Sequence, residues 1–457
     1  MYDIAIIGGG PGGYAAALYA HNFGLSVALV EKDRVGGTCL LRGCIPAKAL
    51  IESGEVFATV KSAADFGVTT SDPQFEWPVA IERKGKIVEG LVNGLAGMLK
   101  TRGVETLNGF GSLAGDGKVV VAHEDGSSTE IEARAIIIAT GSSPATIPGY
   151  EINGSTIVTS DEALDWESRP ESVAIIGAGA IGCEFASFLA DVGTEVHIFE
   201  VQDQLVPGME PEAVTVLSRA FRRKGIKMHL GAGVGQPEMA ADSVTIPFGD
   251  ERITVQTALV AVGRRPMTGS INLEAIGVTT DNGYIAVDRA TMLTSAPGVY
   301  AVGDIVAGTP QLAHVAFAEA IAAVTHLATG ETAAIDYNAI PMVVYTHPEI
   351  AWVGRTEAVA EADGFVVTTH EHAMRGIGRA IIQGQTGGTV KIVAEQDGKL
   401  LGATVAGPGA GEMIHELMYA IGFEALPSDA AAFIHAHPTI SEAIGEALMA
   451  SAGRSLH

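Results

Sequence analysis

Near the N-terminus, apolar and polar positions alternate in a way typical of a strand, a turn, a helix and a second strand. Residues 3–31 run from a short apolar stretch through a glycine-rich turn into a helical stretch that stops at Gly24, and then into an apolar run ending at Glu31. Residues 172–200 repeat this order with the same spacing of glycines and end at Glu200. The pattern predicts two βαβ units of similar architecture.

The glycine-rich turn of each unit is typical of a dinucleotide-binding site. Both follow the spacing Gly-x-Gly-x-x-Gly, with Gly8, Gly10 and Gly13 in the first unit and Gly177, Gly179 and Gly182 in the second. Ile181 occupies one of the variable positions of the second motif. The first glycine permits the turn, the second lets a pyrophosphate approach the backbone, and the third lets the helix pack on the strand. The N-terminus of the helix then presents unpaired N–H groups to the phosphates.

An acid closes each unit. Glu31 and Glu200 both lie 23 residues after the first glycine of their unit, where a carboxylate accepts hydrogen bonds from an adenosine ribose. The alternative, that both motifs are tight turns without a ligand, does not explain the two acids. Because a carboxylate repels a 2′-phosphate, Glu200 predicts that the second site prefers NAD to NADP.

Further along the chain, the pattern predicts more segments. Residues 135–142 are typical of a buried strand and turn, and the stretch 142–155, rich in Ser, Pro and Gly, is typical of a linker. The second βαβ unit opens a domain that ends near residues 258–266. A later apolar strand ends at Asp304, where an acid could reach back to the ligand of the first domain. From about Ile340, strand-like runs precede a helical tail, as in a separate α+β domain.

Length and composition fit a multidomain globular protein. A chain of 457 residues favours two to four domains, and 47% hydrophobic with 18% charged residues excludes wholesale disorder. The 57 glycines show no Gly-X-Y period, which excludes collagen and favours tight turns and close backbone approaches. A net charge of −25 disfavours nucleic acid as a partner.

The sequence predicts neither a membrane segment nor a targeting segment. Mean hydropathy is +0.29, but no uninterrupted apolar run is long enough to span a bilayer. The N-terminal stretch has no basic start, since the first lysine or arginine is Lys32, and it is predicted to be part of the fold. With only three cysteines, a reducing compartment is favoured. We therefore expect a cytoplasmic protein with no membrane partner.

Two cysteines follow the first nucleotide unit. Cys39 and Cys44 lie in the stretch GGTCLLRGCIPA, with Lys48 next to it, and their spacing fits no common structural zinc pattern, so no metal is predicted. If the segment opens a helix, both sulfurs lie on one face, and the helix N-terminus stabilises a thiolate. Lys48 then lies one turn beyond Cys44 on that face. The hypothesis is a redox-active dithiol beside a flavin, and the alternative is a pair of buried apolar cysteines.

A histidine and a glutamate near the C-terminus form a second candidate. In HAHPTISEAIGE, Pro438 suits the first turn of a helix, which would place His437 just outside its N-terminus and Glu442 in its second turn. A carboxylate beside an imidazole fixes its tautomer and raises its basicity. Taken alone, the segment favours a capping histidine with a solvated glutamate. A thiol-based redox site favours the acid–base pair instead, because dithiol oxidation must dispose of protons. His435 is expected to support the local fold.

The sequence resembles the flavoprotein pyridine nucleotide–disulfide oxidoreductases along essentially its whole length. The motifs that carry the resemblance are, in order, IIGGGPGGY, GGTCLLRGCIPAKAL, ATGS, IIGAGAIGCEFA, AVGRRP, YAVGD, LAH, YTHPEIAWVG, GPGAGEMI and HAHPTISEA. The last three are typical of the branch that oxidises protein-bound dihydrolipoyl groups to the lipoyl disulfide and reduces NAD+.

The resemblance implies an α/β fold with two Rossmann-like domains, a central domain and a C-terminal α+β dimerisation domain. The implied boundaries are 1–145 for an FAD domain with the dithiol, 146–268 for an NAD domain, 269–339 for a central domain that completes the FAD site, and 340–457 for the interface domain. The implied cofactors are FAD and NAD, and the implied assembly is a homodimer in which His437 reaches the cysteines of the other subunit. A lipoyl-bearing acyltransferase or carrier protein is the implied partner.

The resemblance also assigns roles to residues. It implies that Cys39 is the interchange thiol that meets the substrate, that Cys44 is the thiolate next to the flavin, and that Lys48 and Glu184 pair near the flavin. His437, oriented by Glu442, is the implied base. The implied FAD contacts are Gly8, Gly10, Gly13, Glu31, Lys32, Gly37, Thr38, Lys48, Gly111, Thr140, Gly141, Asp304 and Ala313. The implied NAD contacts are Gly177, Gly179, Ile181, Gly182, Glu200, Gly263 and Arg264.

Three stretches depart from the family pattern. Leu41 stands where the family often has Asn, LAHVAFAEA replaces the polar residues that usually follow its histidine, and HEHAMRGIGRA keeps only Gly378, Arg379 and Ala380 of a familiar pattern. The alternatives are another NAD(P)H-dependent disulfide reductase of this family or a specialised paralogue with a different disulfide substrate. A mercuric reductase would need a second cysteine pair near the C-terminus, and a non-enzymatic scaffold could lose Cys44 or His437.

Overall fold

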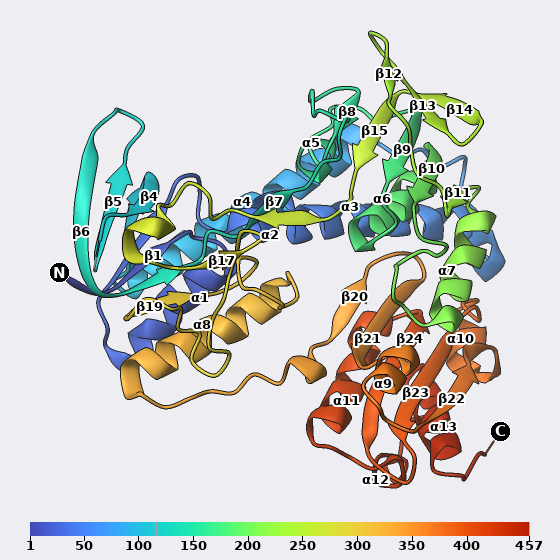
Figure 1. Ribbon diagram of the computed structural model, residues 1–457. Helices are drawn as coiled ribbons and strands as arrows, with labels where there is room; N and C mark the ends of the chain where they lie inside the picture. Colours follow the sequence, from blue (N-terminus) through green and yellow to red (C-terminus); the bar gives the residue numbers. More distant parts are fainter. Residues whose placement is uncertain (116, 457) are drawn as a thin grey trace. The chain divides into compact units, whose positions relative to one another are not determined.

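The structure is a computed structural model that describes residues 1–115 and 117–456 of the chain. The residues fall into two compact units. Figure 1 shows the chain coloured along its sequence, from blue at the N-terminus to red at the C-terminus. The first unit consists of residues 1–49, 78–145 and 263–335. The second unit consists of residues 50–77, 146–262 and 336–456.

The first unit contains a parallel sheet that extends into an antiparallel layer. The parallel strands follow the order β3 (Glu105–Asn108), β2 (Val27–Glu31), β1 (Tyr2–Ile7), β6 (Ser128–Ile138) and β19 (Val299–Ala301). The first part of β6 pairs in antiparallel with β5 (Lys118–Ala122), which pairs with β4 (Phe110–Leu113). The apolar runs of β1 and of the end of β6 are buried, as expected for a parallel sheet covered on both faces.

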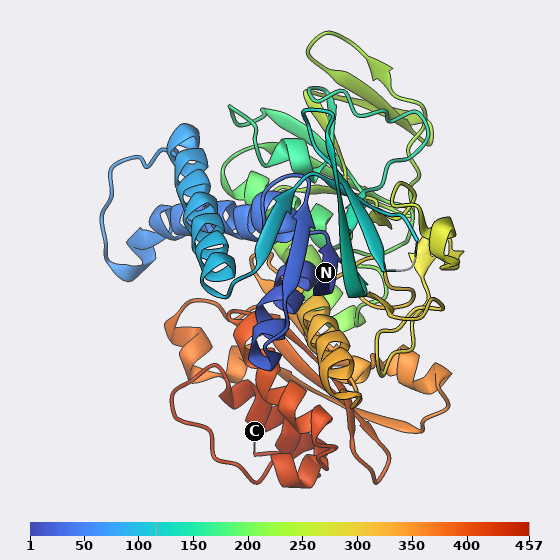
Figure 2. The same cartoon turned by 90° about the vertical axis from the view of Figure 1, so that its left-hand side faces the viewer.

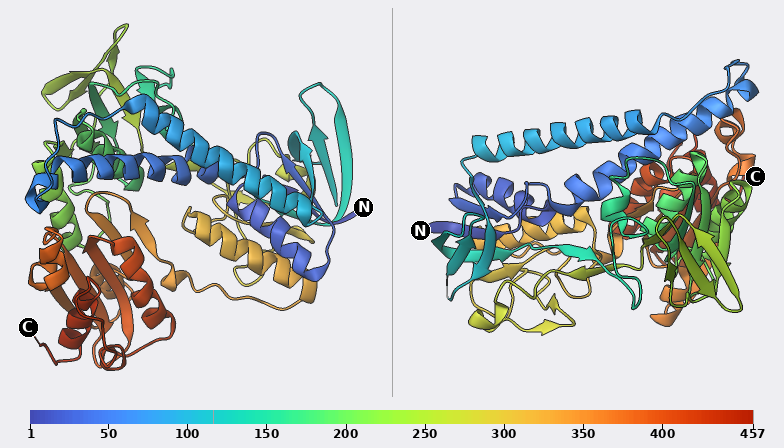
Figure 3. Two further views of the ribbon diagram at one scale, coloured as in Figure 1. Left: turned by 180° about the vertical axis from the view of Figure 1, so that it is seen from behind. Right: turned by 90° about the horizontal axis from the view of Figure 1, so that it is seen from above.

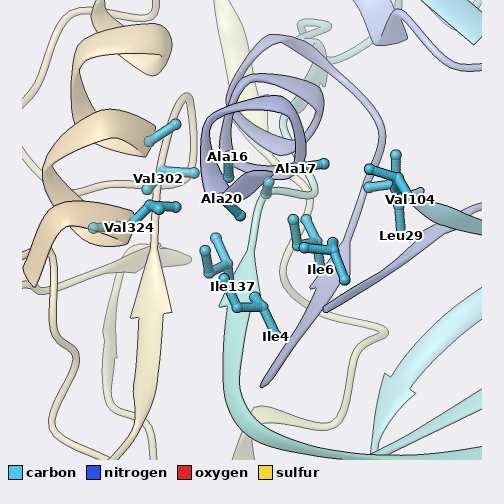
Figure 4. Close-up of a cluster of buried hydrophobic side chains, with 14 of the residues drawn as sticks. Ile4, Ile6, Ala16, Ala17, Ala20, Leu29, Val104, Ile137, Val302 and Val324 are labelled. Atoms are coloured by element: carbon cyan, nitrogen blue, oxygen red, sulfur yellow. The ribbon is translucent and has the colours of Figure 1, made fainter. Parts of the chain in front are cut away.

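The helices of the first unit are α1 (Pro11–Ala20), η1 (His21–Phe23), α2 (Gly37–Arg42), the start of α3 (Cys44–Lys61), α4 (Trp77–Thr101) and α8 (Ala313–Thr329). Helix α1 packs on the sheet through small residues. Figure 4 shows Ala16, Ala17 and Ala20 of α1 facing the apolar side chains of β1 and β6. Figure 2 shows α1 in blue beside α8 in orange, and Figure 3 shows α4 as a long helix. A Cβ at Gly12 would lie 2.9 Å from Val302, so this packing depends on a residue without a side chain.

Short paired segments complete the first unit. They are the antiparallel pairs β7 (Ser142–Pro144) with β16 (Arg264–Pro266) and β17 (Thr280–Asp281) with β18 (Tyr284–Ile285), together with η3 (Leu273–Ile276). The stretch 142–155 was predicted to be a linker, and this is wrong for its first residues. Ser142–Pro144 forms a strand because Arg264–Pro266, distant in sequence, supplies its partner.

The second unit contains a second parallel sheet. Its strands follow the order β11 (Lys227–Leu230), β10 (Glu195–Glu200), β9 (Ser172–Ile176), β15 (Thr257–Val260) and β8 (Ile157–Val158). Its helices are α5 (Ser160–Ala163), α6 (Ala180–Asp191) and α7 (Pro211–Arg223). An antiparallel sheet of β12 (Glu238–Met239), β13 (Val244–Phe248) and β14 (Glu251–Val255) follows.

The C-terminal part of the second unit has its own antiparallel sheet and core. The strand order is β20 (Met342–Val344), β21 (Glu349–Gly354), β24 (Leu400–Gly407), β23 (Thr389–Glu395) and β22 (Val367–Ala373). Helices α11 (Ala410–Gly422) and α13 (Glu442–Ser451) pack on it. The remaining elements are η2 (Ala63–Phe66), η4 (Tyr337–Ala339), α9 (Glu357–Ala362), η5 (Met374–Gly376), α10 (Gly378–Ile382) and α12 (Pro427–Ala430).

The predicted fold class is confirmed. Both predicted βαβ units are present, β19 lies in the apolar run before Asp304, and the C-terminal region is α+β. The four domain boundaries given in the sequence analysis remain predictions.

Candidate redox and nucleotide-binding site

The first glycine-rich turn, Gly8 to Gly13, is called the first cradle here. Gly8 has φ +105°, a value that residues other than glycine rarely adopt. Its N–H donates to the Val30 carbonyl at 2.8 Å. A Cβ at Gly13 would lie 1.8 Å from the Gly8 carbonyl oxygen, so the helix can approach the strand only with glycine there. Glu31, at the end of β2, accepts from the Gly9 N–H at 2.6 Å and from the Asp33 N–H at 2.8 Å.

The second cradle, Gly177 to Gly182, reproduces this geometry in the second unit. Gly177 has φ +103°, its N–H donates to the Phe199 carbonyl at 2.8 Å, and a Cβ at Gly182 would lie 2.0 Å from the Gly177 oxygen. Glu200, at the end of β10, accepts from the Ala178 N–H at 2.9 Å and from the Gln202 N–H at 3.0 Å. The predicted repeat is therefore a repeat of conformation as well as of sequence.

Both cradles end at the N-terminus of a helix. The residues that precede α1 and α6 are Gly10, with φ −74° and ψ −172°, and Gly179, with φ −71° and ψ −171°. Neither N-terminus has a side-chain cap, so the first N–H groups point to where a phosphate would bind.

The strand end next to the first cradle has a buried polar atom that fits a ligand. Thr140 follows β6, and a Cβ at Gly8 would lie 3.2 Å from the Thr140 Cα. Within the described residues, the Thr140 Oγ1 is buried and has no hydrogen-bond partner. A buried hydroxyl without a partner is costly, and a bound dinucleotide would satisfy it. The residues present therefore fit FAD at the first cradle.

Asp304 and Arg264 lie together in the first unit. The Ser142 hydroxyl donates to the Asp304 carboxylate and accepts from Arg264 Nε at 2.7 Å, while Arg264 Nε lies 4.0 Å from Asp304 Oδ2. Arg264 Nη2 also donates to the Ser142 carbonyl at 2.8 Å. Arg264 and Gly263 belong to the unit of the first cradle, whereas Glu200 belongs to the other unit, so their predicted NAD contacts remain predictions.

The two cysteines lie on two helices, and the prediction of one shared helix is wrong. Cys39 is in α2, Cys44 is the first residue of α3, and Gly43 between them has φ −146° and ψ −114°, outside the helical region. A Cβ at Gly43 would lie 2.9 Å from the Thr38 oxygen, so the tight break requires glycine. Cys44 does start a long helix, and Lys48 lies one turn further along it, as expected.

Both cysteines are free thiols in contact with each other. A hydrogen bond with Cys44 is the main cause that raises the pKa of the Cys39 thiol above its usual range, and burial and the charge of Cys44 act in the same direction. Lys48 and the Cys44 N–H oppose this effect by lowering the pKa of Cys39. Cys44 is the more exposed of the two.

Tyr14 is a site residue that the sequence analysis missed. Burial, and next the charges of Cys39 and Cys44, raise the pKa of Tyr14 to about 12, so its hydroxyl lies within electrostatic reach of both sulfurs. Its ring contacts Phe317 of α8, with centroids 5.6 Å apart. The signal in the sequence that could have identified Tyr14 is its position directly after Gly13, the last glycine of the first cradle.

His437 and Glu442 form the predicted pair. His437 Nδ1 lies 2.8 Å from Glu442 Oε1, and the His437 side chain is 77% exposed. The hydrogen bond with His437 and then the Thr439 N–H, at 2.9 Å, hold the pKa of Glu442 below its usual value. The prediction that Pro438 begins the helix is wrong. α13 begins at Glu442, because the Glu442 carboxylate accepts a hydrogen bond from the Thr439 N–H in a turn that precedes the helix.

His435 supports this segment, as expected. Its Nε2 lies 2.6 Å from Glu416 Oε1, and a Cβ at Gly445 would lie 2.7 Å from its ring, so the imidazole packs against the backbone of α13. The hydrogen bond with Glu416 raises the pKa of His435.

Glu184 and Cys183 follow the second cradle on α6. Glu184 is buried, and its Oε1 accepts from the Tyr345 N–H at 3.0 Å. The predicted partner Lys48 lies in the other unit, so the Lys48–Glu184 pair remains a prediction. Cys183 is fully buried, and its thiol hydrogen-bonds the Ala178 carbonyl at 3.2 Å. Burial raises the pKa of Cys183, as for a structural and unreactive thiol.

The other predicted contacts lie at several places along the chain. Gly37 starts α2, and a Cβ there would lie 2.5 Å from Gly10 Cα. A Cβ at Gly111 of β4 would lie 3.0 Å from Ile7, beside the first cradle's strand. Lys32 follows β2, Thr38 lies in α2, Gly141 follows Thr140, Ala313 starts α8 and Ile181 lies in the first turn of α6.

No helix in residues 1–115 and 117–456 combines the length and apolarity needed to cross a bilayer. Within the same residues, no cluster of three or more His, Cys, Asp or Glu side chains is arranged to hold a metal ion.

Comparison with known families identifies the class of protein. The family described as pyridine nucleotide-disulphide oxidoreductase matches residues 2–320, and its dimerisation domain matches residues 340–448. The chain belongs to this family and carries its dimerisation domain.

Curated relatives narrow the comparison. The chain is 38% identical to dihydrolipoyl dehydrogenase of Bacillus subtilis, with 100% of this chain and 99% of the relative covered. It is 40% identical to dihydrolipoyl dehydrogenase 2 of Haloarcula marismortui, with coverage of 100% and 98%.

Solved structures share the fold. LpdA from Mycobacterium tuberculosis superposes with a TM-score of 0.91 at 28% identity, covering 98% of this chain and 99% of that one. The flavoprotein disulfide reductase RclA from Escherichia coli, solved as a Cu(II) complex, superposes with a TM-score of 0.88 at 25% identity, with the same coverage.

Proposed function

We propose that this protein is a dihydrolipoyl dehydrogenase, which oxidises a protein-bound dihydrolipoyl group to the lipoyl disulfide and reduces NAD+ to NADH. The observation that carries the proposal is the hydrogen-bonded Cys39–Cys44 pair in the unit of the first cradle. The full-length similarity to dihydrolipoyl dehydrogenases supports the choice of substrate. FAD and NAD are the cofactors of this reaction.

The reaction begins with Cys39 and Cys44 joined as a disulfide. One substrate thiol gives its proton to His437, and its sulfur attacks Cys39, so that the Cys39–Cys44 bond breaks and Cys44 leaves as a thiolate. The second substrate thiol then attacks the mixed disulfide, closes the lipoyl disulfide and leaves its proton on Cys39. The raised pKa of Cys39 supports this distribution of the proton. The cysteine pair now holds two electrons from the substrate.

These two electrons leave the cysteine pair for NAD+, which becomes NADH, and the Cys39–Cys44 disulfide forms again. When bound, FAD supplies the two-electron relay between the dithiol and NAD+. The first cradle, with Glu31, would hold FAD, and Lys48, Thr140 and Asp304 would lie along it. The second cradle, with Glu200 for the ribose, would hold NAD+. Overall, one dithiol and NAD+ give one disulfide, NADH and a proton.

His437 acts through its outer nitrogen. Because Nδ1 is hydrogen-bonded to Glu442, this nitrogen carries the ring proton, and Nε2 is left to accept a proton from the substrate. Glu442 is the positioning residue, since its hydrogen bond to Nδ1 fixes the tautomer. A homodimer would bring His437 of each subunit to the cysteines of the other. The lipoyl group would arrive on an acyltransferase or carrier protein.

The experiment counts thiols as well as NADH. The oxidised holoenzyme, unfolded and alkylated, should label only Cys183, whereas anaerobic treatment with dihydrolipoamide should make all three cysteines label. Subsequent addition of NAD+ should yield one NADH per active site and return Cys39 and Cys44 to the unlabelled state. If dihydrolipoamide leaves the labelling unchanged, or if no NADH forms, the proposed function is wrong.

A variant tests the base. His437→Gln should slow thiol oxidation by about 100-fold or more, because a positioned general base contributes that much. Reduction of the cysteine pair by NADH should proceed at the original rate, since His437 acts only on the substrate side. His415→Gln, a change of an exposed histidine on α11, is the matched control and should leave both rates unchanged.

A further inference from the structure

A lysine of the C-terminal sheet is surrounded by three carboxylates of the second unit. Lys391 lies in β23, and its Nζ lies 2.7 Å from Glu357 Oε2 and 2.8 Å from Glu210 Oε2. Both carboxylate oxygens of Glu212 lie 3.1 Å from the same nitrogen. The side chains of Lys391 and Glu210 are only 4% and 3% exposed. Because a displaced group would leave a buried charge without its partner, the cluster holds its members in place.

Glu210 is held from two sides. Its Oε2 bonds Lys391, and its Oε1 accepts from the Glu357 N–H at 2.6 Å, at the start of α9. Burial, the largest single contribution, lowers the pKa of Lys391, but the hydrogen bonds with Glu210 and Glu357 together outweigh it and raise the pKa above its usual value. The lysine therefore stays charged at physiological pH and keeps attracting the Glu210 carboxylate.

Glu210 is also the last residue of the loop that follows the acid of the second cradle. Loop 201–210 connects Glu200, at the end of β10, with α7, which begins at Pro211 and packs against β23 and β24 (Figure 1). Every residue of this loop is described, and none belongs to a helix or strand, so the course of the loop depends on individual contacts.

The start and the middle of loop 201–210 contact the second cradle. The Gln202 N–H donates to the Glu200 carboxylate at 3.0 Å, and the Val206 N–H donates to the Ala178 carbonyl at 2.8 Å. Val206 is buried and has φ +45°, a conformation that β-branched residues rarely adopt. Such a residue persists only where its surroundings hold it in place. The loop is therefore kept on the turn of the cradle against the preference of its own backbone.

We propose that Lys391 is a positioning residue for NAD+, which holds loop 201–210 on the second cradle through Glu210 and so keeps Glu200 in place for the adenosine ribose. The inference rests on the proposed function and goes beyond it, because Lys391 lies in the part of the chain that matches the dimerisation domain and not in a nucleotide-binding motif. Of the three carboxylates around Lys391, only that of Glu210 belongs to the loop.

The test measures NAD+ binding to the oxidised holoenzyme by calorimetry and then turnover with dihydrolipoamide. The central variant is Glu210→Gln, which keeps an oxygen for the Glu357 N–H but loses the charge that attracts Lys391. The lysine keeps two carboxylates, so its own charge stays paired. We expect the dissociation constant for NAD+ to rise about three- to tenfold, as when one hydrogen bond is displaced. KM for NAD+ should rise in parallel, with kcat and KM for dihydrolipoamide unchanged.

Two controls separate this role from a structural one. Glu357→Gln removes the charge that lies 2.7 Å from the same lysine but belongs to α9, outside the loop. Asp191→Asn removes a buried charge 2.7 Å from Lys224, at the other end of α7. Both should leave the NAD+ affinity unchanged, and thermal unfolding of each variant shows whether the losses of stability are comparable.

The lysine itself is tested by Lys391→Met. This variant leaves three carboxylates without their cation, and the dissociation constant for NAD+ should rise at least as far as in Glu210→Gln. If Lys391→Met does not fold, Glu210→Gln decides the question. The flavin content of each variant, read from its absorbance, must match that of the unchanged protein.

The outcomes separate this inference from the proposed function. If Glu210→Gln binds NAD+ like the unchanged protein, or if Glu357→Gln and Asp191→Asn weaken binding equally, Lys391 has only a structural role and the inference is wrong. If the unchanged protein binds NAD+ but does not oxidise dihydrolipoamide, the proposed substrate is wrong, and the dissociation constants still decide the role of Lys391. If the unchanged protein does not bind NAD+, both are wrong.

Discussion

In both cradles the chain returns to the glycine-rich turn after the second strand, but it continues differently. In the first cradle the Gly36 N–H donates to the Gly9 carbonyl at 2.8 Å, and Gly37 then comes so close that a Cβ would lie 2.5 Å from Gly10 Cα. α2, which carries Cys39, begins at Gly37. Two consecutive glycines with positive φ therefore bring a redox helix directly onto the turn.

In the second cradle the corresponding hydrogen bond joins the Val206 N–H to the Ala178 carbonyl, also at 2.8 Å. Gly208 follows two residues later, but a Cβ there or at Gly179 would meet nothing within 4 Å, and the next helix begins only at Pro211. The two turns thus have the same backbone geometry, and they differ in how the chain continues after it returns to the turn. The first cradle is contacted by the start of the helix that carries Cys39, whereas the glycine before α6 in the second cradle has no such contact within 4 Å.

The largest expected effect separates the cysteine chemistry of the two units. Cys44→Ser should lower NAD+ reduction by dihydrolipoamide by at least about 1,000-fold, as expected when one member of a group that acts together is removed. Steady-state NADH formation measures this, and the variant should still bind FAD. Cys183→Ala changes the inert thiol after the second cradle, and its turnover should match that of the original protein. Comparable losses in the two variants would contradict the assignment of the dithiol.

The next effect tests whether each cradle serves its own nucleotide. In Gly13→Ala and Gly182→Ala the new Cβ meets the turn oxygen at 1.8 Å and 2.0 Å, a clash worth about 1–3 kcal/mol, or about a tenfold to hundredfold loss of affinity. Gly13→Ala should lose flavin, measured by absorbance, and Gly182→Ala should keep flavin but raise KM for NAD+. The assignment fails if the two variants show the opposite pattern.

A smaller effect concerns the acids that close the cradles. Glu200→Gln should shift the ratio of kcat/KM between NADP and NAD about tenfold toward NADP, because it removes a charge that repels the 2′-phosphate and weakens the ribose contact. Steady-state rates with both coenzymes measure the ratio. Glu31→Gln is the matched change in the first cradle and should weaken flavin binding without altering this ratio. An unchanged ratio in Glu200→Gln would show that Glu200 does not contact the ribose.

The cradles could be predicted from the sequence because their geometry is local. Glycine spacing, a following helix and a terminal acid determine the turn within one βαβ unit, and Glu31 and Glu200 lie where their spacing places them. The Nδ1 contact of His437 with Glu442 is also local, since five residues separate them.

Contacts between distant segments could not be predicted in this way. Tyr14 meets Phe317 only because α1 and α8 pack together, and Ser142 meets Asp304 although 162 residues separate them in the sequence. The break at Gly43 was missed for a related reason. The helical pattern runs through it, and only the proximity of the Thr38 oxygen shows why the chain must turn there.

The smallest expected effect concerns α3, which starts at Cys44 in the first unit and continues into the second unit from Leu50 onward. There Glu55 lies 3.9 Å from His347 Nδ1. Burial, and then the charges of Glu349 and Glu52, raise the pKa of Glu55 to about 7. The second unit thus holds a carboxyl that resists ionisation.

The sign of its contribution follows from this raised pKa. Between about pH 4.5, its ordinary pKa, and about pH 7 the unfolded chain loses the proton while the folded chain keeps it, so stability falls as pH rises through this window. Glu55→Gln removes the titration. The variant should match the original protein near pH 4.5 and exceed its stability at pH 8 by about 1–2 kcal/mol, a value reduced for partial exposure.

Thermal unfolding of the holoenzyme across this pH range measures the difference, with Glu361→Gln, a change of an exposed glutamate on α9 in the same unit, as the control. A constant difference between Glu55→Gln and the original protein at all pH values would contradict the raised pKa. A difference that grows with pH would show that α3 carries a proton-linked cost in the second unit, far along the helix from the thiol chemistry at its start. The two ends of α3 would then differ in chemistry, because the first unit holds a reactive thiol at Cys44 and the second unit holds a neutralised carboxyl at Glu55.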